Sequence, residues 1–210
     1  MQGIDGIFYI IILIMSIVIH EYAHGYTAYL LGDNTARLSG RLTLNPIKHL
    51  DLFGSIILPL LLIVMNAGFV IGWAKPVPYN PNNLRDIKKG TFLVAIAGIL
   101  ANLTIAIIFG LLIRFAPLFI SPIMAVSFYK ITSIIVVLNL VLVIFNLIPI
   151  PPLDGSKILF SYMPLKYRYI ENFLEKWGMI LLLFFIIFLW VKVAPLIFIV
   201  FHFITGISLM

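Results

Sequence analysis

The sequence has no cysteine and very little charge. Of its 210 residues, 14 are Lys or Arg and 8 are Asp or Glu, which gives a formal net charge of +6. Without cysteine, disulfide bonds and thiolate metal ligands are excluded, so a bound metal ion would need His, Asp or Glu side chains. No basic run carries interleaved aromatic residues, and we therefore expect no nucleic-acid partner.

Hydrophobic residues, in contrast, make up 62% of the chain, and the mean hydropathy is +1.15. A soluble domain of this length is less apolar, because its surface consists largely of polar residues. We therefore predict an all-α polytopic membrane protein in the lipid bilayer, with about five to six transmembrane helices. The whole chain, residues 1–210, is expected to form a single membrane-embedded domain.

Apolar runs indicate membrane spans at residues 4–31, 91–113 and 123–148. Residues 177–209 form either one long kinked span or a tight helical hairpin. Residues 52–71 are also apolar, but glycine and proline interrupt them, which weakens a helix. We expect this last segment to be re-entrant, so that it dips into the bilayer and returns.

The loops give two further expectations. Residues 35–46 alternate polar and apolar side chains around Gly40, which predicts a short membrane-associated β-hairpin after the first span. Lys and Arg gather in three groups, within residues 37–48, 75–89 and 157–176. If residues 52–71 are re-entrant, all three groups lie on one side of the membrane, which the positive-inside rule assigns to the cytoplasm.

The most informative motif lies inside the first span and reads His20-Glu21-Tyr22-Ala23-His24. In a helix, positions i and i+4 share a face, so both imidazoles can bind one metal ion. Glu21 lies at the flank of that face, where its carboxylate can act on a water molecule as general base. Ionisable residues within a span are unfavourable and usually functional, so the pattern predicts a zinc hydrolase site.

Two histidines leave a catalytic zinc site short of its usual third protein ligand. The candidates are Asp154, His49, Asp51 and His202. Asp154 is the strongest, because it follows a helix end broken by three prolines, where backbone groups need polar partners and a wet cavity is tolerated. Its neighbour Gly155 allows close approach of the backbone.

With these residues in view, the chain resembles the site-2 protease family of intramembrane zinc metalloproteases, in its short prokaryotic branch without a PDZ domain. The resemblance rests on the His20–His24 motif together with residues 146–155, Asn-Leu-Ile-Pro-Ile-Pro-Pro-Leu-Asp-Gly. Residues 97–102 match a further family signature, except that Ile99 stands where the family usually has proline. The similarity covers about residues 8–165 and leaves the C-terminal helices, residues 177–209, outside it.

The resemblance implies one Zn²⁺ per chain, held by His20, His24 and Asp154, with Glu21 as general base and Asn146 assisting the oxyanion or substrate. His49, Asp51 and Asn102 are further candidates for lining the cavity or contacting substrate. Asn102, like Asn139, more often makes an interhelical hydrogen bond.

The resemblance also implies an intramembrane endopeptidase that cleaves within or near transmembrane segments of membrane-protein substrates, as in regulated intramembrane proteolysis. We expect a multi-pass protein of the prokaryotic plasma membrane, with the active site toward the cytoplasmic side and a regulatory membrane partner left open. Two alternatives remain at this point: a membrane ion or metal transporter, and a catalytically inactive substrate-binding member of the same fold. The presence of Glu21 argues against the catalytically inactive alternative.

Overall fold

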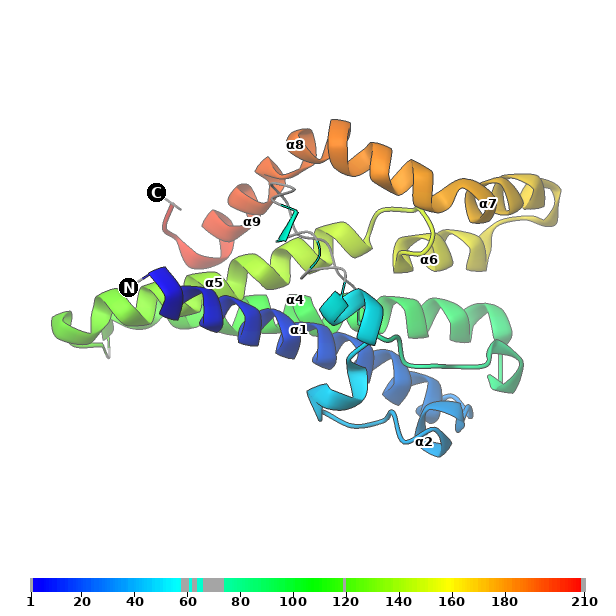
Figure 1. The fold of residues 1–210 in the computed structure, drawn as a ribbon, viewed down its shortest axis with the longest axis horizontal. Coiled ribbons are helices and arrows are strands. Elements are labelled where there is room, and N and C mark those ends of the chain that lie inside the picture. The colour runs from blue at the N-terminus through cyan, green and yellow to red at the C-terminus, as the bar shows by residue number, and fades with distance from the viewer. Residues whose placement is uncertain (1, 58–60, 62–63, 66–73, 119, 209–210) are drawn as a thin grey trace.

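The computed structural model describes residues 2–57, 61, 64–65, 74–118 and 120–208, and every regular element in these ranges is helical (Figure 1). The α-helices are α1 (Gln2–Leu30), α2 (Thr35–Leu38), α4 (Ile87–Phe115), α5 (Pro122–Asn146), α6 (Asp154–Tyr162), α7 (Arg168–Phe184), α8 (Trp190–Val193) and α9 (Pro195–Thr205). Short 3-10 or π-type segments are η1 (Pro46–His49), η2 (Leu52–Ile57), η3 (Pro81–Asn83), η4 (Ala116–Leu118), η5 (Leu165–Tyr167) and η6 (Phe185–Leu189).

Four helical stretches of the described residues are long and apolar enough to cross a membrane, so the expected five to six transmembrane helices were too many. They are Phe8–Leu30, Ile87–Leu118, Ala125–Asn146 and Arg168–Val193. The excess in the predicted number of spans lies mainly in the C-terminal region, where the fourth stretch begins at Arg168 and not at residue 177. The remaining helix α9 has 11 residues, a length of about 17 Å, against roughly 30 Å for the apolar core of a bilayer.

The predicted β-hairpin at residues 35–46 is wrong, because these described residues form no strand. The Asp33 carboxylate accepts hydrogen bonds from the backbone N and the hydroxyl of Thr35, and this local bonding starts the helical turn α2. Gly40 then takes a positive φ of 66°, and the Arg41 N–H donates to the Ala36 carbonyl. Side-chain bonding and a left-handed glycine thus override the alternating pattern.

Helix α4 occupies the centre of the fold and packs against α1, α5, α6 and α9. Small residues along α4 allow this close approach, and Gly98 faces α1 while Gly110 faces α9. Asn139 of α5 donates a 3.0 Å hydrogen bond to Ser16 of α1, so its expected role between helices is confirmed.

The end of α1 lies beside the start of α4, and the two helices run in opposite directions (Figure 1). The Arg85 N–H donates to the Leu31 carbonyl at 3.1 Å, and Asp33 accepts from Asn80 N and Asn83 Nδ2 at 2.7 and 2.8 Å. The stretch between the helices therefore leaves and returns at the same end of the molecule. The predicted re-entrant segment itself is described only at 52–57, 61 and 64–65, and its other residues lie outside the described ranges.

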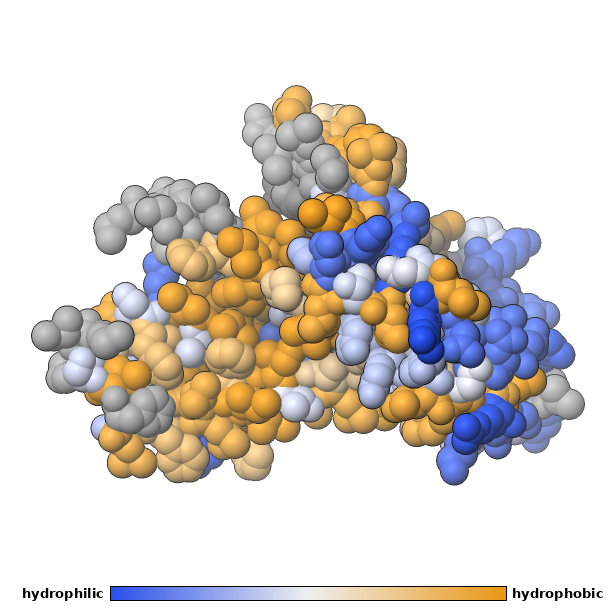
Figure 2. All heavy atoms as spheres, turned by 90° about the horizontal axis from the view of Figure 1, so that it is seen from below, coloured by the Kyte–Doolittle hydropathy of each residue, from blue (hydrophilic) through white to orange (hydrophobic). Residues whose placement is uncertain are grey.

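Figure 2 shows hydrophilic residues gathered mainly at one end of the molecule, with hydrophobic residues over much of the rest of the visible face. The hydrophilic end is the one that carries α2, α6 and the start of α4 (Figure 1). An apolar body with one strongly polar end is typical of a membrane protein.

Candidate metal centre

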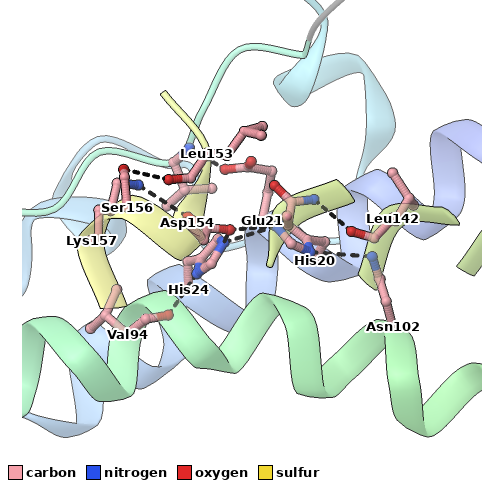
Figure 3. A network of polar contacts seen from close by, with 12 residues as sticks. His20, Glu21, His24, Val94, Asn102, Leu142, Leu153, Asp154, Ser156 and Lys157 are labelled. Carbon is pink, nitrogen blue, oxygen red and sulfur yellow. Dashed lines mark hydrogen bonds and ion pairs between the residues drawn. The ribbon is translucent and has the colours of Figure 1, made fainter. Parts of the chain in front are cut away.

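Helix α1 presents His20 and His24 on one face, and Asp154 at the start of α6 reaches the same point (Figure 3). Asp154 Oδ2 lies 3.0 Å from His20 Nε2 and 3.0 Å from His24 Nε2. The two Nε2 atoms are also 3.0 Å apart. Three atoms of the kinds that bind metal ions, from residues up to 134 positions apart, therefore form an equilateral triangle inside the protein.

The triangle fits a zinc ion better than it fits a set of hydrogen bonds. Tetrahedral zinc with ligands at about 2.0 Å separates its donor atoms by roughly 3.3 Å, close to the observed edges. A proton on one nitrogen, in contrast, can lie along only one edge of such a triangle. All three residues are buried, with 5% to 8% of each exposed, so the donors have little access to bulk water. Three protein donors leave the fourth position that catalytic zinc sites keep for water.

The other ring nitrogens of the two histidines are held by α4. The His24 Nδ1–H donates to the Val94 carbonyl at 2.7 Å, which leaves the Nε2 lone pair for a metal ion. Asn102 Nδ2 lies 3.2 Å from His20 Nδ1, and Asn102 Oδ1 has no partner among the described residues. A 180° rotation of this amide places Oδ1 on an Nδ1–H and leaves His20 Nε2 free to bind metal.

Gly98 forms the part of α4 directly beneath the imidazole pair. A Cβ atom at this position would lie 2.5 Å from His24 Nε2 and 2.7 Å from His20 Nε2. No side chain fits there while both nitrogens keep their places. The sequence signature at residues 97–102 thus has a direct steric reason.

The proline-rich turn before α6 brings Asp154 to the histidines. Gly155 makes this possible, because a Cβ there would lie 2.4 Å from the Leu147 carbonyl oxygen. Asp154 Oδ1 accepts from Lys157 Nζ at 3.1 Å. Burial alone would raise the pKa of the Asp154 carboxyl, but its contacts with His20 and His24 and the charge of Lys157 hold that pKa well below its usual range.

Glu21 lies beside the triangle and is held by the extended residues 74–80, which we call the strap. The Val77 N–H donates to Glu21 Oε2 at 2.8 Å. A carboxylate oxygen of Glu21 also lies within 4.8 Å of both histidine donors, but an oxygen of Asp154 is nearer to both, at 3.0 Å, so Asp154 is the better placed of the two for a third ligand. Val77 is buried against Gly25 of α1, where a Cβ would lie 2.7 Å from Val77 Cγ1.

These residues surround a small cavity of about 130 Å³. Its walls include the three donors, Glu21, Asn146, Val94 of α4, Pro152, Lys157 and the strap residues Pro76, Val77 and Tyr79. The structure therefore brings together all five residues named for zinc binding and catalysis, and it adds Lys157, Val77 and Gly98, to which the sequence assigned no role in the site. For Lys157, the signal was its i+3 spacing from Asp154.

His49 and Asp51 are placed elsewhere. His49 Nε2 lies 2.8 Å from the Thr43 carbonyl, and Asp51 Oδ1 accepts from Gly54 N at 2.7 Å, so these side chains hold local turns. Neither residue lines the cavity described above. His202, the remaining candidate ligand, is exposed in α9.

Comparison with known proteins gives independent evidence about the family of this chain. Residues 112–189 match peptidase family M50. A Bacillus subtilis protein named "Putative zinc metalloprotease YwhC" is 43% identical over 190 residues, which cover 89% of this chain and 80% of that protein. Proteins named "Putative zinc metalloprotease Rip2", from Mycolicibacterium smegmatis and Mycobacterium tuberculosis, are 33% and 32% identical over 152 residues, or 71% of this chain and 56% of each relative. No solved structure matches.

Proposed function

Since this chain belongs to peptidase family M50 and is an intramembrane zinc metalloprotease of the site-2 type, we propose that His20, His24 and Asp154 bind its zinc ion. The observation that supports this ligand set is the buried triangle of donors with 3.0 Å edges. The resemblance inferred from the motifs, and the zinc-dependent peptidase activity that it implied, are confirmed by the similarity to the named relatives.

Glu21 is the general base of the proposed mechanism. A bound zinc ion would polarise the scissile carbonyl and make water more acidic. Glu21 takes one proton from the attacking water at the carboxylate oxygen that Val77 does not hold, and later gives this proton to the amine nitrogen of the leaving peptide. Attack of the water oxygen forms the new C–O bond, and the C–N bond then breaks as the carbonyl double bond re-forms. The oxygen and one hydrogen of the water end in the new carboxyl group, and its other hydrogen ends on the new amine.

Asn146 supplies a polar group on the same cavity wall. Its Nδ2 donates to the Leu142 carbonyl at 2.9 Å, in the last turn of α5. An amide nitrogen carries two hydrogens, and we assign the second to the carbonyl oxygen of the substrate.

Membrane proteins are the substrate class, and we propose cleavage within or near their transmembrane segments. The cavity is lined by residues of α1, α4 and α5, which contain three of the four stretches that are long and apolar enough to cross a membrane within the described ranges. A helical substrate must unwind first, because its carbonyls are hydrogen-bonded within the helix. The strap holds Glu21 through the Val77 N–H and forms one wall of the cavity, and we propose that an extended peptide displaces this segment.

We further propose that the protein lies in the plasma membrane of a prokaryotic cell with its polar end in the cytoplasm. Many Lys and Arg residues lie in segments at that end, among them those before α4 and those around α6. The positive-inside rule places such loops on the cytoplasmic side. The metal centre, bounded by α6 and the strap, then lies toward the cytoplasmic side.

Glu21→Gln tests the mechanism in detergent-solubilised protein, with a model transmembrane peptide as substrate. We expect cleavage to fall by about 10²- to 10⁴-fold, because the amide cannot accept the proton of water. Zinc content should stay at the parent value, because Glu21 is not a ligand. Glu175→Gln, an exposed glutamate of α7, is the matched control. Parent-level cleavage by Glu21→Gln would exclude Glu21 as the base.

A further inference from the structure

Lys157 contacts the one oxygen of Asp154 that does not face the histidines. Its Nζ lies 3.1 Å from Asp154 Oδ1, whereas Asp154 Oδ2 is the vertex of the donor triangle. The two oxygens of a single carboxylate are thus divided between an ammonium group and the metal-binding position (Figure 3).

This contact differs from an ordinary surface pair at i,i+3 spacing, which contributes little to stability. The Asp154 side chain is only 7% exposed, and Lys157 lines the cavity although 41% of its side chain is exposed. The Lys157 ammonium also lies 5.9 Å from the centre of the Tyr79 ring, an arrangement that favours a cation–π contact. Tyr79 belongs to the strap, whose end is fixed where Asp33 accepts a hydrogen bond from Asn80 N. A second element of the structure, the strap, therefore also lies against the Lys157 side chain where it reaches Asp154.

The position of Lys157 matters because a carboxylate can bind a metal ion through one oxygen or through both. Binding through both oxygens would bring Oδ1 toward the coordination position that a catalytic site keeps for water. An ammonium group on Oδ1 opposes that rotation, because the charge-assisted hydrogen bond to a carboxylate that is only 7% exposed would be lost.

We propose that Lys157 is a positioning residue that restricts Asp154 to binding zinc through Oδ2 alone. This inference rests on the proposed ligand set, and it assigns to Lys157 a role in the number of oxygens bound rather than in the chemical step. Loss of the ammonium group should weaken zinc binding by about 10- to 100-fold, as is typical when the partner of a metal ligand is removed.

The test compares Lys157→Met and Lys157→Arg with the matched control Lys166→Met, all in detergent-solubilised protein. Lys166 is an exposed lysine close to the ring of Tyr167, at 4.7 Å, and it does not line the cavity. Zinc affinity is measured by competition with a chelator. The visible spectrum of the cobalt-substituted protein reports coordination, because tetrahedral cobalt absorbs more strongly than cobalt with more ligands.

We expect Lys157→Met to lose zinc affinity and to show a weaker cobalt spectrum, and Lys157→Arg and Lys166→Met to remain near the parent. If Lys157→Met does not fold, Lys157→Gln takes its place in the same measurements. An affinity and a cobalt spectrum equal to those of Lys166→Met would overturn the inference.

Asp154→Ala separates this outcome from failure of the ligand set itself. If Asp154→Ala loses zinc while Lys157→Met behaves like the parent, the proposed function stands and only the role of Lys157 is wrong. If Asp154→Ala binds zinc as tightly as the parent, the ligand set is wrong, and the inference about Lys157 falls with it.

Discussion

Gly98→Ala adds one methyl group beside the two imidazole donors, and its effect follows from the geometry. The new Cβ would lie 2.5 Å from His24 Nε2, where ordinary contacts begin at 3.4 Å, so one of the two atoms must move by about 0.9 Å. Metal–ligand distances tolerate deviations of only about 0.2 Å. We therefore expect zinc affinity to fall by at least about 100-fold.

The fold should survive this change. Alanine favours a helix over glycine by about 1 kcal/mol, whereas an extra methyl group in a packed interior costs about 1–3 kcal/mol. The net loss of up to about 2 kcal/mol is smaller than the total stability of a typical folded protein. Zinc binding and folding should thus be separable in this variant.

Gly110→Ala is a closely matched control, because it adds the same methyl group to the same helix. A Cβ at Gly110 would lie 2.4 Å from Ile204 Cγ2, in the contact between α4 and α9. Zinc content after purification, chelator competition and thermal unfolding should be measured for both variants. Gly110→Ala should lower stability only and Gly98→Ala should lose zinc. A Gly98→Ala protein that holds one zinc ion with parent affinity would refute the reasoning.

Three further predictions concern the strap, the Asp33 carboxylate that binds the end of the strap, and the orientation of the protein in the membrane. Val77→Pro removes the N–H that holds Glu21. Because a hydrogen bond to a charged group contributes about 1.5–3 kcal/mol, kcat should fall by about 10- to 100-fold relative to Val77→Ala. Equal values of kcat in the two variants would contradict this prediction. Burial alone would raise the pKa of Asp33, but hydrogen bonds from Thr35, Asn83 and Asn80 lower it. The ionised Asp33 carboxylate therefore stabilises the fold fully above about pH 4, and this stabilisation is lost as the pH falls through the pKa of Asp33 in the folded protein. Thermal unfolding should therefore show Asp33→Asn to be less stable at pH 7 by about 1–3 kcal/mol, with a smaller difference in acid; a difference independent of pH would exclude the carboxylate as its cause. Because the chain has no cysteine, single cysteines at the exposed Asn82 and Ser121 should react with impermeant reagent from opposite faces, Asn82 from the cytoplasm; labelling of Asn82 from outside intact cells would reverse the proposed orientation.

The sequence predicted the histidine pair because it depends only on helix periodicity. His20 and His24 are four residues apart, so any regular helix places them on one face. The apolar surroundings of α1 required the segment to be helical in a bilayer, since unpaired backbone groups are not tolerated there. Glu21 followed from the same geometry.

The β-hairpin and the fifth and sixth spans failed for physical reasons that a pattern does not contain. At residues 35–46, alternation suggested strands, but the Asp33 carboxylate and Gly40 stabilise a helical turn instead. In the C-terminal region, hydropathy alone did not show where one helix begins and how much length is left for another.

By itself, the sequence determined a membrane protein with two histidines and a glutamate on one helix, spaced so that both imidazoles can reach one metal ion, because composition and 3.6-residue periodicity act locally. Only the tertiary structure decided how Asp154 closes the donor triangle, why Gly98 must lack a side chain, and that Val77 and Lys157 hold the two carboxylates. These contacts join residues up to 134 positions apart, and such distances are set by the packing of α1, α4 and α6 and not by the local order of residues.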